Sequence, residues 1–197
     1  KKRRLDLERF QLHNFDEVRS LLLQTILTLA VGEEACGFEH RDLHWGNVLL
    51  DRCPEEGEAR FRLRGVDVRV QTAGLKASLI DFTLSRLQAV SGEIAFCDLS
   101  ADPELFQGPK GDVQADTYRR MRKATRGDWQ EHRPKTNALW VHYMADILLN
   151  QKQWGGTAAE LRRLKRFRRA ALGYASAAEA VWDELFEDLW VSGEEAA

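Results

Sequence analysis

The chain has 197 residues, 44% of them hydrophobic, and a formal net charge of −2. This length and composition predict a single domain over residues 1–197 with a substantial core. The near-zero charge argues against a protein-wide positive field, so we expect no direct nucleic-acid binding and no membrane partner. No apolar run approaches the roughly 18 residues of a spanning helix. Cys36, Cys53 and Cys97 form no CxxC pair, which indicates reduced thiols in an intracellular protein.

The first half of the chain predicts one long helix and a small sheet. Asn14 and Glu17 have the spacing of a helix-capping pair, and apolar residues then recur at helical spacing to about Val31. Short apolar segments predict the strands of one small sheet, at residues 48–50, 61–64 and 75–80. The polar stretch 53–58 is predicted to be a turn.

The second half predicts a series of helices, at about residues 112–123, 137–149, 158–172 and 177–189. Thr157 with Glu160, and Ser176 with Glu179, repeat the capping pair at the start of the last two helices. Gly173 is predicted to separate them. The predicted fold class is therefore mainly α with a small β region (α+β).

The most specific motif is the run HRDLHWGN at residues 40–47, which fills every fixed position of the kinase catalytic-loop pattern H-R-D-L-x-x-x-N. Phosphoryl transfer needs a carboxylate that orients the attacking hydroxyl and accepts its proton, together with oxygen ligands for Mg²⁺. Asp42 is the candidate for the first role, and Asn47 is the candidate for the second. ATP and Mg²⁺ are therefore the expected cofactors.

A second motif follows the predicted strand 75–80, where the chain reads Asp81-Phe82-Thr83. Kinases carry Asp-Phe-Gly at this point, and its Asp binds the phosphates through Mg²⁺. Asp81 is therefore a second candidate ligand for metal and cofactor. A β-branched residue in place of Gly tolerates positive φ poorly, so we expect a fixed, active-like turn that does not flip.

Several stretches together resemble haspin, an atypical family of eukaryotic serine/threonine kinases: HRDLHWGNVLL, IDFTLSR, FCDLS with the acidic stretch after it, and QADTYRRM. The resemblance covers about Leu5 to Leu189 and implies a protein-kinase-like C-terminal lobe. It implies transfer of the ATP γ-phosphoryl group to Ser or Thr of a basic protein. The implied target is a threonine of a histone tail, in a nuclear or chromosomal setting.

Residues 93–116 carry six carboxylates against one lysine. The resemblance implies that Asp102 and Glu104 hold the basic tail and that His44 contacts the substrate. A solvated acidic loop is the alternative for the carboxylates, and a packing role beside Trp45 is the alternative for the histidine.

Three residues are expected to support the site: His40, Arg41 and Asp116. Arg41 would normally pair with an activation-loop phosphate, but no A-P-E triplet follows Asp81. The resemblance implies activity that does not depend on that phosphorylation. Asp116 resembles the buried helix Asp of kinases that accepts hydrogen bonds from the catalytic-loop backbone.

The phosphate-covering half of a kinase is not recognisable in this sequence. Only 39 residues precede His40, and they contain neither a G-x-G-x-x-G loop nor a V-A-I-K strand. We expect the N-terminal lobe to be a missing partner and the chain to be a fragment of a longer kinase. Such a fragment should be inactive alone, because positioning supplies most of the catalysis.

Two other functions stay open on the sequence alone. Small-molecule kinases of the aminoglycoside or choline type share a loop similar to residues 42–47, although Arg41 and the residues after Thr83 favour a protein kinase. A pseudokinase or binding module that uses the acidic groove without ATP is the non-enzymatic alternative.

The run RRLKRFRR at residues 162–169 is typical of a nucleic-acid patch or a nuclear address. Leu161, Leu164, Ala171 and Leu172 form an apolar stripe beside it. We therefore interpret the run as the solvated face of an amphipathic helix.

Overall fold

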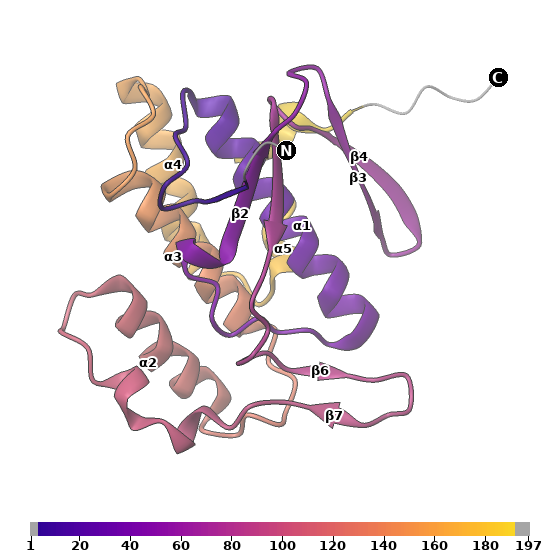
Figure 1. Cartoon of the computed structure of the whole chain (residues 1–197), viewed down its shortest axis with the longest axis vertical. Coiled ribbons are helices and arrows are strands. Elements are labelled where there is room, and N and C mark those ends of the chain that lie inside the picture. The colour runs from indigo at the N-terminus through magenta and orange to yellow at the C-terminus, as the bar shows by residue number, and fades with distance from the viewer. Residues whose placement is uncertain (1–3, 192–197) are drawn as a thin grey trace.

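A computed structural model describes residues 4–191 and shows helices packed around a small antiparallel sheet (Figure 1). The helices are α1 (Phe15–Cys36), α2 (Val113–Thr125), α3 (Lys135–Asn150), α4 (Ala158–Ala171) and α5 (Ala177–Ala180). The strands are β1 (Leu5–Asp6), β2 (Val48–Arg52), β3 (Glu58–Leu63), β4 (Val66–Gln71), β5 (Leu75–Leu79), β6 (Leu87–Gln88) and β7 (Ile94–Ala95). Short 3-10 helices cover Trp45–Asn47, Leu99–Ala101, Pro103–Phe106 and Glu184–Leu189. The α+β fold class is confirmed.

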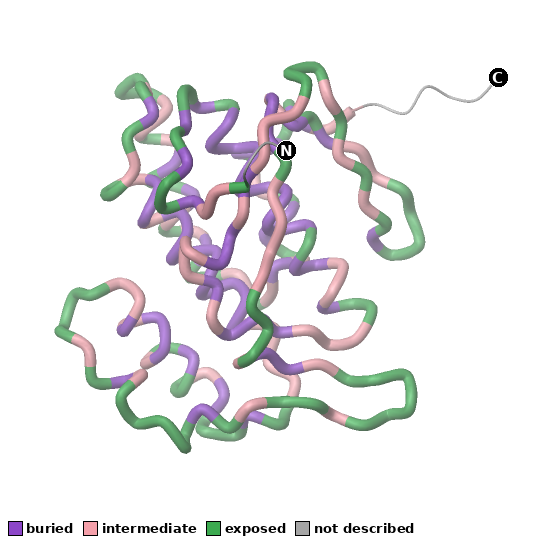
Figure 2. The backbone as a smooth tube through the Cα atoms, in the orientation of Figure 1, coloured by how far each residue is buried: buried purple, intermediate pink, exposed green. Residues whose placement is uncertain are grey.

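Helix α1 forms the centre of the core. It begins where the Asn14 side chain accepts a 2.9 Å hydrogen bond from the Glu17 N–H, as predicted. It ends at Gly37, whose φ of 56° lies in the left-handed region that glycine adopts without steric cost. Buried residues run along α1 and α3 in Figure 2. Helix α1 is buried on several sides because β5, α3 and α5 all pack against it.

The sheet brings the two predicted motifs together. Strand β2 lies between β1 and β5, and both pairings are antiparallel. Because β2 directly follows the catalytic loop and β5 leads into Asp81, the pairing of Val48 with Leu79 joins the two motifs at one end of the sheet. The Ile80 N–H extends this pairing with a 3.0 Å hydrogen bond to the Asn47 carbonyl.

One strand prediction is wrong. Residues 61–64 do not join the sheet with β2 and β5, because β3 pairs with β4 in a separate two-stranded hairpin. The turn residues Arg64 and Gly65 both have positive φ, 53° and 73°, which is the conformation of a type I′ hairpin turn. The Gly at the second turn position was the available signal for this hairpin.

The last predicted helix is also wrong beyond its first turn. Ser176 caps α5 through the Glu179 N–H, as the spacing predicted. The α-helix then stops at Ala180, and a 3-10 helix follows over Glu184–Leu189. Asp183 starts this second element, because its carboxylate accepts a 2.8 Å hydrogen bond from the Leu185 N–H.

The predictions for α2, α3 and α4 are confirmed with boundaries within two residues, whereas α1 continues five residues past the predicted end near Val31, to Cys36. Thr157 and Glu160 form the predicted reciprocal capping box of α4. No helix in residues 4–191 combines the length and the apolar character that a membrane crossing requires.

Candidate active site

The catalytic loop is held by its own side chains. The Asp42 carbonyl accepts a 2.8 Å hydrogen bond from the Asn47 side-chain amide, and the Asp42 N–H lies 3.4 Å from Nδ1 of His40. The Asn47 N–H donates to the His44 carbonyl at 2.9 Å. His44 also caps the short helix that follows it, because its Nδ1 accepts from the Gly46 N–H at 3.1 Å. These contacts fix the backbone on both sides of Asp42.

The Asp42 carboxylate is half-buried and has one defined partner. Its Oδ1 accepts a hydrogen bond from the Tyr118 hydroxyl of α2, a residue that sequence reasoning missed. Burial raises the pKa of Asp42, and the hydrogen bond from Tyr118 acts in the opposite direction. Within residues 4–191 the other oxygen, Oδ2, has no hydrogen-bond partner, so it can accept a proton from a substrate hydroxyl.

Asp81 lies in a turn that its neighbour Thr83 stabilises. The Thr83 hydroxyl and N–H both donate to Oδ1 of Asp81, at 2.7 Å and 3.3 Å. These two hydrogen bonds hold the pKa of the Asp81 carboxyl below its usual range, so it is ionised. The positive φ of this turn, 61°, belongs to Asp81 and not to Thr83. The turn is therefore held by a side-chain hydrogen bond, which is a different mechanism from the predicted restriction of φ at residue 83.

His40 connects the loop to this turn. Its Nε2 lies 3.1 Å from the Ile80 carbonyl, and its buried ring packs edge-on against Phe82. Burial lowers the pKa of His40 to about 4, so the ring is neutral at physiological pH. The carbonyl partner assigns the proton to Nε2, which leaves Nδ1 to accept from the Asp42 N–H. The predicted supporting position of His40 agrees with these contacts.

The supporting role predicted for Asp116 is wrong. Asp116 is half-exposed on α2 and forms an ion pair with Arg119, with no hydrogen bond to the catalytic loop among the described residues. Asn137, in the first turn of α3, occupies that role instead. Its side-chain oxygen accepts a 3.0 Å hydrogen bond from the His40 N–H, and its amide donates to Glu33 and to the Phe38 carbonyl.

The comparisons with known proteins agree with this geometry. The family model described as "Haspin like kinase domain" matches residues 1–172. The chain belongs to the haspin-like kinase family. It is 48% identical over 185 residues to a serine/threonine-protein kinase haspin homolog of Arabidopsis thaliana. The matched region covers 93% of this chain and 30% of the Arabidopsis protein.

Two further relatives show the same partial coverage. The serine/threonine-protein kinase haspin of Mus musculus is 40% identical over 89% of this chain and 24% of its own length. The haspin homolog hrk1 of Schizosaccharomyces pombe is 36% identical over 83% of this chain and 36% of its own length. The chain thus spans between a quarter and about a third of the haspins that it matches.

Arg41 of this haspin-like lobe is fully buried and already has a carboxylate partner. Its Nε donates to Glu39 at 3.1 Å, its guanidinium donates to the Trp129 carbonyl at 2.6 Å, and it lies over the Trp129 ring. Glu39 is also buried, and it further accepts hydrogen bonds from Thr136 and from the Arg133 N–H. An internal carboxylate is therefore the ion-pair partner of Arg41 in this structure, and activity without phosphorylation stays a prediction.

Two carboxylates of the acidic segment 93–116 stabilise short helices. Asp98 and Asp102 accept hydrogen bonds from the Ser100 and Glu104 N–H groups, at 2.9 Å and 3.1 Å. The segment is anchored to the core by Phe106, which packs against Tyr118. Asp102 and Glu104 are both exposed, and neither forms an ion pair in the part of the chain that the structure describes. They are free to meet a positively charged partner.

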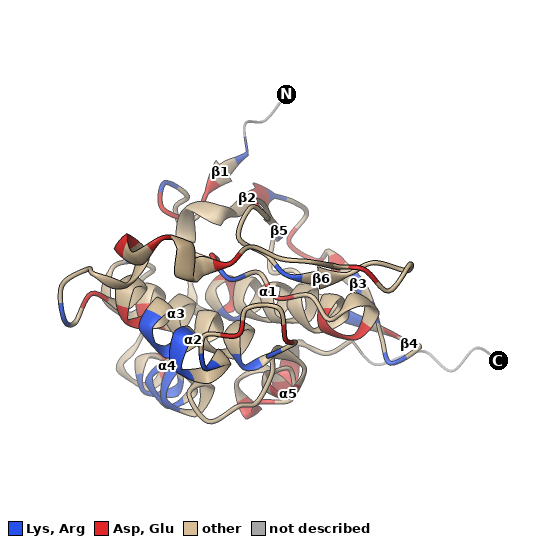
Figure 3. Cartoon of the chain, turned by 90° about the horizontal axis from the view of Figure 1, so that it is seen from below, with Lys and Arg blue, Asp and Glu red and all other residues tan. Residues whose placement is uncertain are grey.

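Positive charge gathers on other elements. Figure 3 shows Lys and Arg over α2 and α4. On α4, Leu164 and Phe167 are buried while Arg168 and Arg166 pair with Asp146 and Glu184. The amphipathic-helix interpretation of this run is confirmed for Leu164 and Ala171, which are buried, but Leu172 is 38% exposed and follows the last residue of α4.

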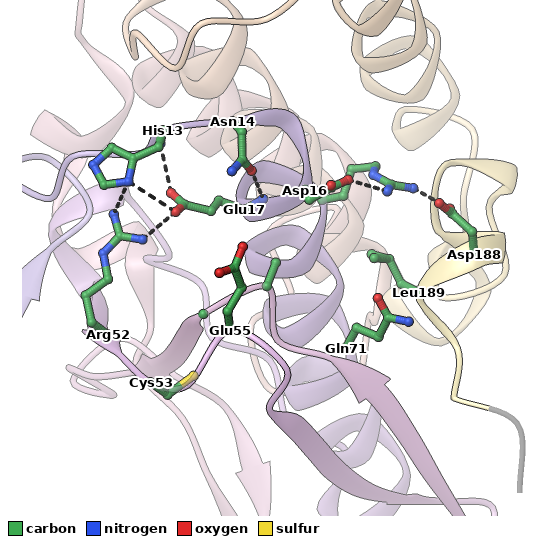
Figure 4. A pocket seen from close by; sticks show the side chains of 13 residues that line it. His13, Asn14, Asp16, Glu17, Arg52, Cys53, Glu55, Gln71, Asp188 and Leu189 are labelled. Carbon is green, nitrogen blue, oxygen red and sulfur yellow. Dashed lines mark hydrogen bonds and ion pairs between the residues drawn. The ribbon is translucent and has the colours of Figure 1, made fainter.

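A polar pocket lies at the N-terminal end of α1, between β2, the β4–β5 turn and the last 3-10 helix (Figure 4). Most of its charged residues pair with one another: Arg52 contacts Glu17, and Arg19 contacts Asp16 and Asp188. None of the predicted site residues lines it. These ion pairs tie the start of α1 to the C-terminal part of the lobe, and we interpret the pocket as structural.

Proposed function

We propose that this chain is the catalytic lobe of a serine/threonine protein kinase that transfers the γ-phosphoryl group of ATP to a basic protein. The observation that carries the proposal is the convergence of Asp42, Asn47 and Asp81 through the hydrogen bond between Ile80 and Asn47. Asp42 orients the substrate hydroxyl and takes its proton at Oδ2, while the oxygens of Asn47 and Asp81 face the nucleotide.

The donor set suits Mg²⁺. The Asn47 side-chain nitrogen donates to the Asp42 carbonyl, so the Asn47 side-chain oxygen can bind a metal. Thr83 contacts Oδ1 of Asp81, so Oδ2 of Asp81 can bind a metal as well. Hard oxygen ligands from few protein groups, completed by phosphates, are what Mg²⁺ prefers. Among residues 4–191 no group of three or more His, Cys, Asp or Glu side chains could hold a metal by itself. Bound Mg²⁺ would neutralise charge on the transferred phosphoryl group.

The exposed carboxylates of Asp102 and Glu104 support a substrate rich in Arg and Lys, because such pairs form charge-assisted contacts. His44, beside Asp42 in the loop, is assigned to the same substrate surface. The family resemblance makes a histone-tail threonine the proposed target and the nucleus or the chromosome the proposed location.

The proposal includes a second lobe. Residues 1–197 carry no G-x-G-x-x-G loop and no V-A-I-K strand, and the matched haspins are three to four times as long in the first two comparisons. We assign the covering loop and the phosphate-binding Lys to sequence outside this chain. The isolated chain should then give no measurable transfer, because the phosphates are not positioned.

The experiment is a transfer assay with the full-length protein, Mg²⁺ and γ-labelled ATP. The acceptors are a basic peptide with one Thr, the same peptide with Ala in its place, an acidic Thr peptide, kanamycin and choline. Label should enter the basic Thr peptide and neither the Ala peptide nor the small molecules. Transfer to kanamycin or choline, or transfer to no acceptor at all, would contradict the proposal.

A further inference from the structure

The hydroxyl group that contacts the proposed base belongs to a buried ring that packs between other aromatic side chains. Tyr118 is 4% exposed, and its ring packs edge-on against Trp140 of α3 at 5.4 Å and against Phe106 at 6.5 Å. Aromatic packing on two sides fixes the ring plane, and with it the position of the hydroxyl oxygen.

The direction of the contact with Asp42 is fixed by chemistry. An ionised carboxylate can only accept, and a phenol that is buried beside a carboxylate keeps its proton. Tyr118 therefore donates to Oδ1 of Asp42. Because the backbone of Asp42 is already held by Asn47 and His40, this hydrogen bond restrains the remaining freedom, which is rotation of the carboxylate about its side-chain bonds.

The same helix also holds the residues that directly follow Asp102 and Glu104 in the chain. Arg119, next to Tyr118, donates to the carbonyls of Phe106, Gly108 and Pro109, at 3.1, 2.9 and 3.2 Å. Helix α2 thus contacts the proposed base with one residue and the end of the proposed peptide-binding segment with the next. A shift of α2 would move both together.

We propose that Tyr118 is a positioning residue of the phosphoryl transfer: it clamps Oδ1 of Asp42 so that Oδ2 is presented to the hydroxyl of the bound peptide. The inference rests on the proposed kinase function and adds to it a residue outside the catalytic loop. A merely structural tyrosine would contribute through its ring, whereas a positioning tyrosine contributes through its O–H and only while Asp42 is present.

The test uses the full-length protein and the basic Thr peptide. Tyr118→Phe keeps the ring and removes the donor, and it should lower kcat about ten-fold while both KM values stay within about two-fold. The matched control is Tyr174→Phe, which removes a hydroxyl that donates to Asp183 away from the loop and should leave kcat unchanged. Two unnatural residues of nearly equal volume at position 118 distinguish the hydrogen-bond donor from the shape of the side chain. 4-Aminophenylalanine, which has an N–H donor, should restore most of kcat, and 4-methylphenylalanine, which has no donor, should not.

A double-variant cycle gives the decisive reading. In an Asp42→Asn background, Tyr118→Phe should lower the residual rate by less than about two-fold, because the residue through which it acts has been changed. An active wild type with an unchanged kcat in Tyr118→Phe, or equal losses in both backgrounds, would overturn the positioning role and leave the proposed function standing. A wild type without any transfer would overturn both.

Discussion

The Thr83 hydroxyl lies 2.7 Å from Oδ1 of Asp81 and donates a hydrogen bond to it. With the Thr83 N–H on the same oxygen, two donors hold Oδ1 of the carboxylate, while Oδ2 has no hydrogen-bond partner among the described residues. The left-handed backbone of Asp81 is costly for a non-glycine residue, and the hydrogen bonds from Thr83 compensate for part of that cost.

Replacing Thr83 with Val should therefore weaken metal binding, because the turn loses the hydroxyl that holds Oδ1 of Asp81 in place. Valine is close in volume but has no hydroxyl, so Oδ1 loses its stronger donor. Loss of such a supporting hydrogen bond typically costs metal sites about ten-fold in affinity. The Mg²⁺ concentration for half-maximal rate in the full-length protein should rise by about that factor. Thr83→Ser, which keeps the hydroxyl, should behave as wild type, and a Val variant with unchanged Mg²⁺ dependence would refute the role.

The buried His40 predicts a pH dependence of stability. Its pKa is about 4 in the folded protein and 6.5 when exposed, so between these values the unfolded chain binds more protons. The free energy of unfolding should fall as the pH drops from 6.5 to 4, by roughly 3 kcal/mol in total from this group.

Urea unfolding of the full-length protein, compared with a His40→Gln variant that does not titrate, isolates this effect. The stability advantage of wild type over the variant should be constant above about pH 7.5 and should decrease steadily toward pH 4. An advantage that does not change with pH would show that burial of His40 has no such cost.

Substitution of the buried Asn137 should lower the free energy of unfolding strongly. Asn137→Ala removes the side-chain partner of the His40 N–H and of the Phe38 carbonyl, and one of the three donors to the buried Glu33 carboxylate, which keeps the Ala177 and Ala178 N–H groups. Leaving buried polar groups unsatisfied should cost roughly 2–4 kcal/mol in thermal or urea unfolding. The exposed Asn150 supplies the control, because within residues 4–191 its side chain bonds only Asp146. Asn150→Ala should change stability by less than about 0.5 kcal/mol. Equal effects of the two substitutions would contradict this role of Asn137.

The proposed substrate surface makes a prediction about KM. Asp102→Asn combined with Glu104→Gln should raise KM for the basic peptide several-fold and leave KM for ATP unchanged. Since both carboxylates are exposed, the effect should shrink as salt is raised. Glu55→Gln with Glu56→Gln removes two charges from the exposed turn before β3 and should not change the peptide KM. An acidic peptide accepted as well as a basic one would remove these residues from substrate binding.

The catalytic loop and the Asp81 turn could be predicted because each is a local motif with fixed spacing. Antiparallel pairing of the two flanking strands was enough to bring Asn47 and Ile80 together. The predicted helix starts were also local, since Asn14, Thr157 and Ser176 each cap a helix through the residue three positions later.

Tyr118 and Asn137 could not be found in this way, because their roles depend on how α2 and α3 pack against the loop. Asp116 was the wrong choice on the same helix as Tyr118. Two residues along an α-helix correspond to a rotation of about 200°, so the side that directs Tyr118 to Asp42 directs Asp116 to solvent and Arg119. The β3–β4 hairpin was missed although Arg64-Gly65 carried its turn signal.

The most direct test of the account is the rate of γ-phosphoryl transfer by the full-length protein with Asp81→Asn. Asp81 is exposed and contacts only Thr83 through its side chain among the described residues, so the variant should fold and melt like wild type. The loss of a charged metal ligand should lower the transfer rate to the basic Thr peptide by at least about 100-fold. A folded Asp81→Asn protein that phosphorylates the peptide at the wild-type rate would contradict the assignment of this site.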